Sequence, residues 1–312
     1  MNPIIEIEGL TKDYEKGFWK KKKVRAVDDL NLKVESGQIF GFLGGNGAGK
    51  TTTIKMLMSL IFPTSGSARI LGSDISDVSM HQRIGYCPEN PYFYDYLKPR
   101  ELMDYFGRLF GLDADTRSKR TDSLLRKVGL EEKDWNKQLR KFSKGMLQRV
   151  GLAQSLINDP ELVFFDEPMS GLDPVGRRQV RELIAQLRND GKTVFMSSHI
   201  LTDIEALCDN VAILSAGKLV QSGKLDDLLQ ASGVDKGFEI TIGNVDAAKL
   251  RDLLKRSDEE IGIKPNGVTV TAKSESEVRE ILDHVNGLGG KLIGVNQVRQ
   301  SLEELFVREN KA

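Results

Sequence analysis

The segment that most constrains this chain is Gly44–Thr51, which reads GGNGAGKT. It follows the uninterrupted apolar run Ile39–Leu43 and leads into Ile54, Met56 and Leu57, which are spaced as in a helix. Glycines let backbone N–H groups turn onto phosphate oxygens, and a helix N-terminus adds its positive end. The pattern arises by chance in roughly one chain of this length in a hundred. We therefore predict a phosphate-binding loop rather than an ordinary glycine-rich turn.

The chemistry of the loop predicts the role of its last residues. The Lys50 ammonium can reach the β- and γ-phosphates of a nucleotide, and the Thr51 hydroxyl can hold Mg²⁺. The predicted nucleotide contacts in this segment are Gly44, Asn46, Gly47, Ala48, Gly49, Lys50, Thr51 and Thr52.

A second group of residues suited to phosphate chemistry follows the apolar run Leu162–Phe165. Asp166 at the tip of this predicted strand can enter the Mg²⁺ shell, and Glu167 can polarise an attacking water. Taken alone, two acids after a strand indicate a solvated turn. The phosphate loop upstream favours the catalytic interpretation instead.

The hydrophobic pattern predicts an α/β fold for residues 1–230. Ile39–Leu43, Leu162–Phe165, Val194–Met196 and Val211–Leu214 are continuous apolar runs, typical of parallel strands covered on both faces. Before them, residues 5–7 and 30–34 alternate as half-buried antiparallel strands do. Residues of about 90–160 show helical spacing, so we predict a helical insertion there.

Glycines become frequent after about residue 230, and we predict a small accessory α+β domain over residues 231–312. Phe238–Ile242, Val268–Val270 and Leu292–Val295 are expected strands, and amphipathic helices are expected after each, the last carrying Leu302, Leu305 and Phe306. The predicted order is βαβαβα.

Composition narrows the classes of function. The 312 residues hold 45 Lys and Arg against 45 Asp and Glu, so any contact with nucleic acid or anionic lipid must come from a local patch. The two cysteines, Cys87 and Cys208, have no metal or redox spacing, which favours a reducing cytosol. No signal segment and no apolar run long enough to cross a bilayer is present, so we expect a soluble chain.

Four segments together resemble the nucleotide-binding subunit of an ATP-binding-cassette (ABC) transporter. They are the phosphate loop at 44–51, Phe142–Arg149, Ser170–Asp173 and Ser197–His199, in the order and spacing of that family. The resemblance covers about residues 4–225, and Phe142–Arg149 is its most specific part. It implies a P-loop NTPase fold, ATP and Mg²⁺ as ligands, and ATPase activity.

The resemblance also implies a role for individual residues. Tyr14 would stack on adenine, His199 would contact the γ-phosphate and Glu167 would be the catalytic base. Ser143 and Gly145 would cap the γ-phosphate of ATP held by a second protomer, and Asp173 would link the two sites. Two chains, expected to be identical, would then meet head to tail around two ATP molecules.

Three features depart from the family pattern. Lys144 and Met146 stand where Gly and Gln are usual, and Glu89 stands where a Gln is usual that senses Mg²⁺ and the membrane subunit. Glu89 is either a metal-shell residue or an ordinary loop residue. The insertion Phe18–Arg25 holds five basic residues within six positions beside two aromatics, and is either a lipid contact through Trp19–Arg25 or a solvated hairpin tip.

The resemblance predicts a peripheral protein on the cytoplasmic side of the cell membrane, powering a separately encoded permease in the export direction. A groove beside Glu89 and the aromatic loop Asn90–Pro99 would receive that permease, unless the aromatics belong to the core. Two alternatives are a soluble clamp on DNA or ribosomes, which would need a long coiled coil or a second cassette, and a GTPase. The Asn136–Leu139 segment lacks the acid that guanine recognition usually needs.

Overall fold

The structure is a computed structural model, and it describes residues 3–17, 22–230, 237–254, 261–265 and 267–297. The chain divides into two compact units, Met1–Leu225 and Asp226–Arg308. The sequence places a boundary after residue 230, at the end of helix α7 (Leu225–Gln230), whereas the contacts divide the chain near its start. Among the described residues, no helix combines the length and the apolar character needed to cross a bilayer.

The first unit is built on a six-stranded sheet that is parallel except at one edge. Its order is β10 (Lys218–Lys224), β9 (Asn210–Ser215), β3 (Ile39–Gly44), β8 (Thr193–Ser198), β7 (Leu162–Asp166) and β6 (Ile84–Cys87). Every residue of β3, β7 and β8 is buried. This confirms the α/β class, since continuous apolar runs mark strands that are covered on both faces.

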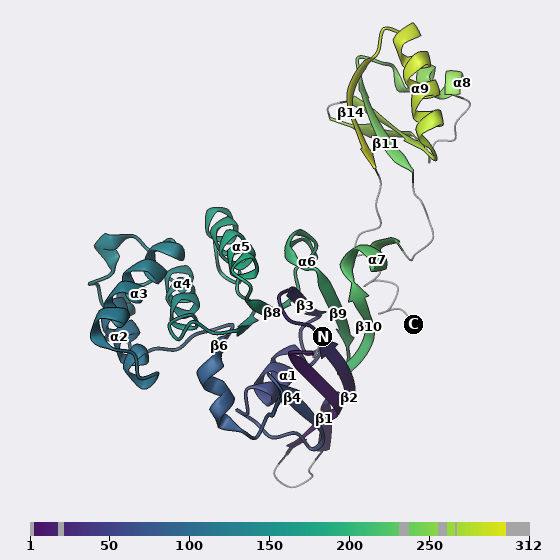
Figure 1. Cartoon of the computed structure of the whole chain (residues 1–312). Helices are drawn as coiled ribbons and strands as arrows, with labels where there is room; N and C mark the ends of the chain where they lie inside the picture. The colour runs from purple at the N-terminus through teal and green to yellow at the C-terminus, as the bar shows by residue number, and fades with distance from the viewer. Residues whose placement is uncertain (1–2, 18–21, 231–236, 255–260, 266, 298–312) are drawn as a thin grey trace. The chain divides into compact units, whose positions relative to one another are not determined.

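Helices cover the two faces of this sheet. Successive side chains of a strand point to opposite faces, and Gly41 of β3 faces helix α6 (Leu201–Leu207), where a Cβ would lie 3.0 Å from Ile204 Cδ1. Its neighbours Phe40 and Phe42 point the other way, into a core that includes Ile54 of helix α1 (Lys50–Leu57). Helix α5 (Pro174–Asn189) packs against β8 and β3 (Figure 1).

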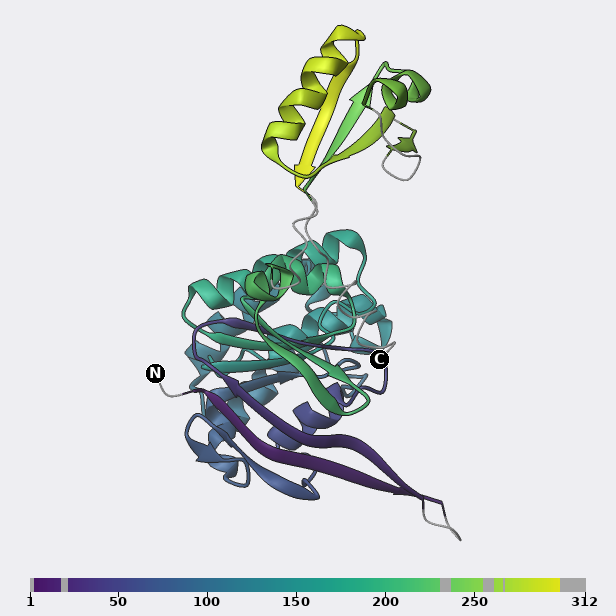
Figure 2. The ribbon, with the colours of Figure 1, turned by 90° about the vertical axis from the view of Figure 1, so that its right-hand side faces the viewer.

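A four-stranded antiparallel sheet packs on the side of α1. Its order is β2 (Lys22–Val34), β1 (Ile5–Lys16), β4 (Ser65–Ile70) and β5 (Ser73–Asp74). Strands β1 and β2 form a long ribbon (Figure 2) in which Lys16 pairs with Lys22. The part of the basic insertion from residue 22 to 25 therefore lies in β2, while residues 18–21 lie outside the described residues.

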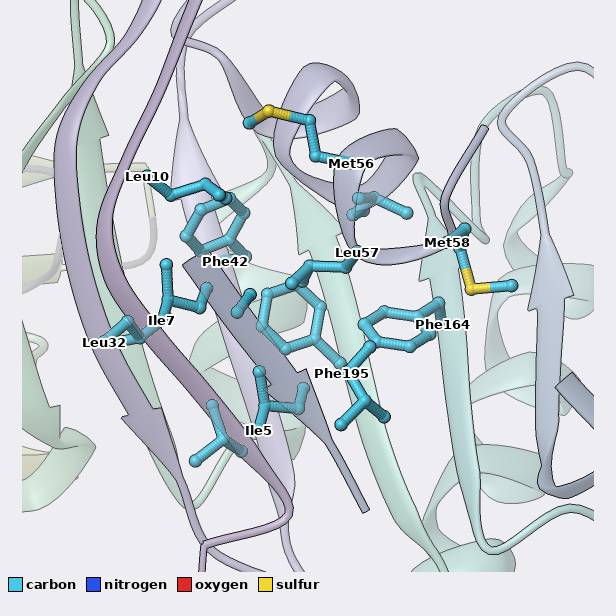
Figure 3. Close-up of a cluster of buried hydrophobic side chains, with 14 of the residues drawn as sticks. Ile5, Ile7, Leu10, Leu32, Phe42, Met56, Leu57, Met58, Phe164 and Phe195 are labelled. Atoms are coloured by element: carbon cyan, nitrogen blue, oxygen red, sulfur yellow. The ribbon is translucent and has the colours of Figure 1, made fainter. Parts of the chain in front are cut away.

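Buried aromatic rings fill the space between the two sheets. The Phe195 ring stacks on Phe40 with centroids 5.4 Å apart and lies 5.1 Å from Phe42 and 5.4 Å from Phe164. Figure 3 shows the rings of Phe42, Phe164 and Phe195 among Ile5 and Ile7 of β1 and Leu57 of α1. The central strands are thus anchored to both the ribbon and the helix that follows the phosphate loop.

The stretch from residue 90 to 160 holds α2 (Pro99–Leu109), α3 (Ala114–Lys127) and α4 (Lys144–Gln154), with short 3₁₀ turns at Glu132–Asp134 and Leu139–Lys141. The longest of these helices has 14 residues, too short for the coiled coil that a DNA or ribosome clamp would need in this fully described stretch. A further 3₁₀ turn, Val78–Arg83, precedes β6.

From residue 237 to 297, the described part of the second unit forms a four-stranded antiparallel sheet with two helices. It contains β11 (Phe238–Gly243), α8 (Ala247–Leu254), β12 (Ile261–Lys264), β13 (Gly267–Ala272), α9 (Glu275–Gly287) and β14 (Lys291–Gln297), with sheet order β12-β13-β11-β14. This is a split βαβ arrangement. Residues such as Ile240, Val270 and Ile281 form its separate core.

The predicted order βαβαβα is wrong because it omits β12. This strand is only four residues long and, apart from Ile261, exposed, so it carries too few buried side chains to show an alternating pattern. The observed order of the described elements is βαββαβ. The predicted final helix around Leu302, Leu305 and Phe306 lies outside the described residues.

The aromatic core gives a test of stability. Replacing Phe195 by Ala is expected to lower the free energy of unfolding by about 3–5 kcal/mol, because a fully buried ring leaves a cavity. Replacing Phe62, which is 76% exposed, by Ala is expected to change the free energy of unfolding by less than about 0.5 kcal/mol. Urea unfolding followed by tryptophan fluorescence measures both variants, since Trp135 is buried in the first unit. Equal losses would show that the rings are not the centre of the core.

Candidate functional site

The candidate site lies at the carboxyl ends of three neighbouring parallel strands. In register, Leu43 of β3 lies beside Ser198 of β8, and Asp166 of β7 lies beside Ser197. The three strands therefore end together, and the segments that follow them start from one edge of the sheet. Ligands collect at this edge in α/β proteins.

The loop from Gly44 to Thr51 has the backbone shape that its glycines predict. Gly47 and Gly49 have φ of 79° and 107°, which side chains disfavour. A Cβ on Gly49 would lie 2.5 Å from the Ala26 carbonyl oxygen, whereas a Cβ on Gly47 would meet nothing within 4 Å. The loop thus packs tightly at its base, while at Gly47 it leaves open space.

Helix α1 starts at the end of this loop without a side-chain cap. Its N-cap is Gly49, which has no side chain to accept a hydrogen bond from the first turn. Thr51 and Thr52 lie half-buried in that turn, and Asn46 is exposed on the loop. An uncapped helix start leaves backbone N–H groups available to an anion.

Lys50 is buried and turned back over the loop. Its ammonium donates to the Gly44 carbonyl at 2.7 Å and lies 3.3 Å from Glu167 Oε1. The side chains of Lys50 and Glu167 are only 6% and 9% exposed. Buried charges persist where they are paired, so the contact between these two groups offsets the loss of water around each.

Asp166 is buried and only half satisfied. Its Oδ1 accepts a hydrogen bond from the Ser197 hydroxyl at 2.5 Å, while its Oδ2 has no hydrogen-bond partner. A buried carboxylate oxygen without a partner is costly. The arrangement fits a bound cation, since carboxylate and hydroxyl oxygens are the ligands that Mg²⁺ prefers.

Glu167 sits at a strained turn that aims its side chain. Its φ is +50°, an unusual value for a residue other than glycine. The backbone N–H is held by both the carbonyl and the hydroxyl of Ser197, at 3.3 and 3.1 Å. Its Oε2 lies 2.8 Å from Nδ1 of His199, whose side chain is 47% exposed. Glu167 therefore bridges the phosphate-loop lysine and a histidine open to solvent.

Ser143, Gly145 and Asp173 lie in a different place. Ser143 is the exposed N-cap of α4, where its hydroxyl accepts from Met146 N at 3.2 Å, and Asp173 caps α5 by accepting from Gly176 N at 2.8 Å. All three line a hollow of about 740 Å³. Within the described part of the chain, no hydrogen bond or ion pair joins them to Lys50, Asp166 or Glu167.

The two remaining predicted residues are less closely tied to the site. Tyr14 is 37% exposed on β1, and the Lys12 ammonium lies 5.4 Å from the centre of its ring. Glu89 follows β6, whose Cys87 pairs with Phe165, so it leaves the sheet at the same edge as Asp166. No hydrogen bond or ion pair joins Glu89 to Asp166 or Thr51 in the ranges that the structure describes.

The structure gives a role to two residues that lie in the recognised motifs but to which the sequence analysis assigns none. Ser197 holds both Asp166 and the Glu167 backbone, and Gln148 of α4 is fully buried with its Nε2 donating to the Pro168 carbonyl at 3.4 Å. Neither follows from the motifs, because each contact joins elements that only the sheet and the helix packing bring together. Cys87 and Cys208 are free and buried, and burial raises the pKa of both thiols.

Ser197 gives a test of how the site is held. Ser197→Ala removes the hydrogen bond to Asp166 and one of two to the Glu167 backbone, so we expect ATP turnover to fall about tenfold, the size expected for losing a hydrogen bond to a charged group. Ser155→Ala is the control, because it removes another buried hydroxyl that bonds only within its own helix. The test measures steady-state phosphate release by both variants. Equal rates for Ser197→Ala and Ser155→Ala would show that Ser197 has no positioning role.

The comparisons with known proteins agree with this geometry. The ABC transporter family matches residues 27–170. The ABC transporter ATP-binding protein sll0415 of Synechocystis is 44% identical over 307 residues, covering 98% of this chain and 84% of its own. The bacitracin transport ATP-binding protein BcrA of Bacillus licheniformis is 42% identical over 247 residues, covering 78% and 77%.

Solved structures give the same result. The ATP-binding subunit of an ABC transporter superposes with a TM-score of 0.65 at 30% identity, covering 74% of this chain and 93% of its own. The ATP-binding cassette MJ0796, in a dimeric post-hydrolysis state bound to ADP and Pi, shares the fold with a TM-score of 0.66 at 24% identity, covering 71% and 98%. The chain therefore belongs to the ABC transporter family and is the ATP-binding, ATP-hydrolysing subunit of such a transporter.

Proposed function

We propose that Lys50, Asp166, Glu167 and His199 form the hydrolytic half of an ATPase site that a second copy of the chain completes. The observation that carries this proposal is the direct contact of Glu167 with both Lys50 and His199 at the edge of the sheet. Charged groups of both signs meet there beside a loop that exposes backbone N–H donors. Such a site suits a triphosphate.

Binding of ATP would begin at the loop. Backbone N–H groups of residues 44–51 and the start of α1 would receive the phosphates, with Lys50 reaching the β- and γ-phosphates. Lys50 would leave the Gly44 carbonyl and Glu167 to do so. Tyr14, whose ring is partly exposed, would stack on the adenine.

Thr51 and Asp166 would hold Mg²⁺, with Glu89 as a further member of its shell. The orphaned Asp166 Oδ2 supports this assignment. When bound, the cation would neutralise charge on the phosphates. Ser197 would keep Asp166 in place through its hydroxyl.

Hydrolysis needs a base at the γ-phosphate. Once Lys50 turns to the nucleotide, the Glu167 carboxylate is free to accept a proton from water as that water attacks the γ-phosphorus. The bond between the γ-phosphorus and its bridging oxygen breaks, which gives ADP and phosphate. His199, 2.8 Å from Glu167, would orient the base and contact the γ-phosphate.

Ser143, Gly145 and Asp173 would serve a partner copy of this chain. Among the described residues, no hydrogen bond or ion pair joins them to Lys50. They line an accessible hollow at the starts of α4 and α5. Two copies placed head to tail would bring this hollow onto the ATP held by the other copy. ATP would then favour the dimer, and hydrolysis would favour its separation.

The aromatic loop Asn90–Pro99 is proposed to receive the membrane permease. Tyr92, Tyr94 and Tyr96 are 94%, 59% and 60% exposed, which favours an interface over the alternative of core packing. Nearby, a hollow of about 300 Å³ is lined by Pro88, Pro91 and Phe106 among others. The apolar face of a short permease helix would fit this combination.

The location and the direction of transport are also part of this proposal. The chain would sit against the cytoplasmic face of the cell membrane through its permease and would drive export, as the family resemblance implies. The basic stretch Trp19–Arg25 would touch anionic lipid, although Arg25 already pairs with Asp13 and Asp28 at 2.8 Å. Binding of the assembled transporter to anionic vesicles, with Lys20–Lys23 replaced by Ser, tests that contact.

The replacement Glu167→Gln tests the ATPase site and the dimer together. ATP is expected to bind, turnover to fall by at least ~10²-fold through loss of the base, and an ATP-dependent dimer to accumulate on size exclusion. Glu161→Gln is the matched control, since Glu161 precedes the same strand and pairs with Arg83 at the surface. Rapid hydrolysis by a persistently monomeric Glu167→Gln chain would remove Glu167 from its role.

The docking loop has its own test. Replacing Tyr94 and Tyr96 together by Ser is expected to lower recovery of the permease with the tagged subunit from solubilised membranes by about tenfold, as for loss of interface anchors. ATP turnover of the isolated subunit should stay unchanged. Tyr105→Ser, which alters an exposed ring on α2, is the control. Full recovery of the permease with the double variant would exclude the loop as its docking surface.

A further inference from the structure

Lys144 is an exposed cation at the start of α4, between Ser143 and Gly145. Its side chain lies along the turn that precedes Asp173, since a Cβ on Gly171 would come within 3.0 Å of Lys144 Cδ and 3.2 Å of Cε. Gly171 has φ of 73° and no side chain, so it leaves room for the lysine stem. The aliphatic part of the Lys144 side chain therefore lies between the start of α4 and the turn before Asp173, the two segments proposed to face the partner's ATP.

The charge of Lys144 is uncommitted within the described residues. Acidic residues line the same hollow, but Glu131 pairs with Lys133 and Asp134 pairs with Lys137 at 2.6 Å. Asp173 accepts from Gly176 N. No carboxylate lies within ion-pair distance of the Lys144 ammonium in the ranges described.

The neighbouring backbone strengthens the positive character of this surface. Ser143 caps only Met146 N, which leaves the N–H groups of Lys144 and Gly145 directed out of the helix start. A helix N-terminus carries about half a positive charge. Lys144 adds a full charge at a position where the family pattern usually has a glycine.

We propose that Lys144 binds the γ-phosphate of the ATP held by the partner copy and so makes the ATP-bound dimer depend on charge. This rests on the proposed head-to-tail dimer. A flexible ammonium suits the compact, multiply charged end of a triphosphate. ADP lacks that group, so Lys144 would favour the dimer with ATP over the dimer with ADP. Exposed charge pairs weaken with salt, so the contact would also make dimerisation sensitive to ionic strength.

The experiment uses the full chain carrying Glu167→Gln, so that bound ATP persists. Sedimentation measures the dimer dissociation constant with Mg²⁺ and ATP at several NaCl concentrations. Lys144→Gln, which keeps most of the stem, is expected to weaken the dimer about tenfold at low salt, the scale of one hydrogen bond to a charged group. Lys144→Arg keeps the charge and is expected to preserve both affinity and salt dependence.

Lys141→Gln is the matched control, because it removes an exposed positive charge three residues away that does not line the hollow. It should leave the dissociation constant and its salt dependence unchanged. A Lys144→Gln chain that dimerises as tightly as its parent, with the same response to NaCl, overturns the role of Lys144. A parent that stays monomeric with ATP overturns the proposed dimer itself, and the two failures are therefore distinguishable.

Discussion

The buried ion pair between Lys50 and Glu167 is the interaction on which the rest of the site depends. Both side chains are almost fully withdrawn from water, so removing either one would leave the other buried without its partner. Under the proposed function, an incoming phosphate would offer Lys50 a stronger partner and leave Glu167 with His199 alone. The same displacement that secures the nucleotide would thus release the base. Lys50 and His199 both contact the Glu167 carboxylate, and the neighbouring Asp166 keeps an unpartnered oxygen suited to a cation.

This pair exists only because three strands end at one level. Asp166 lies beside Ser197 and Leu43 beside Ser198, and the aromatic core between the two sheets keeps those strands in register. A shift of one residue would turn Asp166 away from Ser197, since successive side chains face opposite sides. Two hydrogen bonds from the Glu167 N–H to Ser197 of β8 hold the strained backbone of Glu167 in place. Packing far from the nucleotide therefore sets the geometry of the base.

The chain carries a second set of polar groups that we propose to bind phosphate. The starts of α4 and α5 present Ser143, Lys144 and Asp173 around one hollow, while Lys50 and Glu167 occupy the sheet edge. Gln148 connects the two regions, because it lies in α4 and donates to Pro168 directly after Glu167. If each group is half of a site, two copies would have to pair to complete both. Dimerisation and hydrolysis would then be linked through the same helix.

The sequence alone determined the fold class, the phosphate loop and the two acids at the end of β7, because these signals are local: apolar runs mark buried strands, and glycines mark the loop. The family is likewise shown by comparison of sequences. Strand β12 was not predicted, because it is short and its mostly exposed residues show no alternating hydrophobic pattern. Only the tertiary structure decided that Ser197 holds Asp166, that Glu167 pairs with Lys50, and that Lys144 lies free across Gly171. Each of these contacts joins residues far apart in the chain, so it depends on strand register and helix packing, which no local pattern encodes.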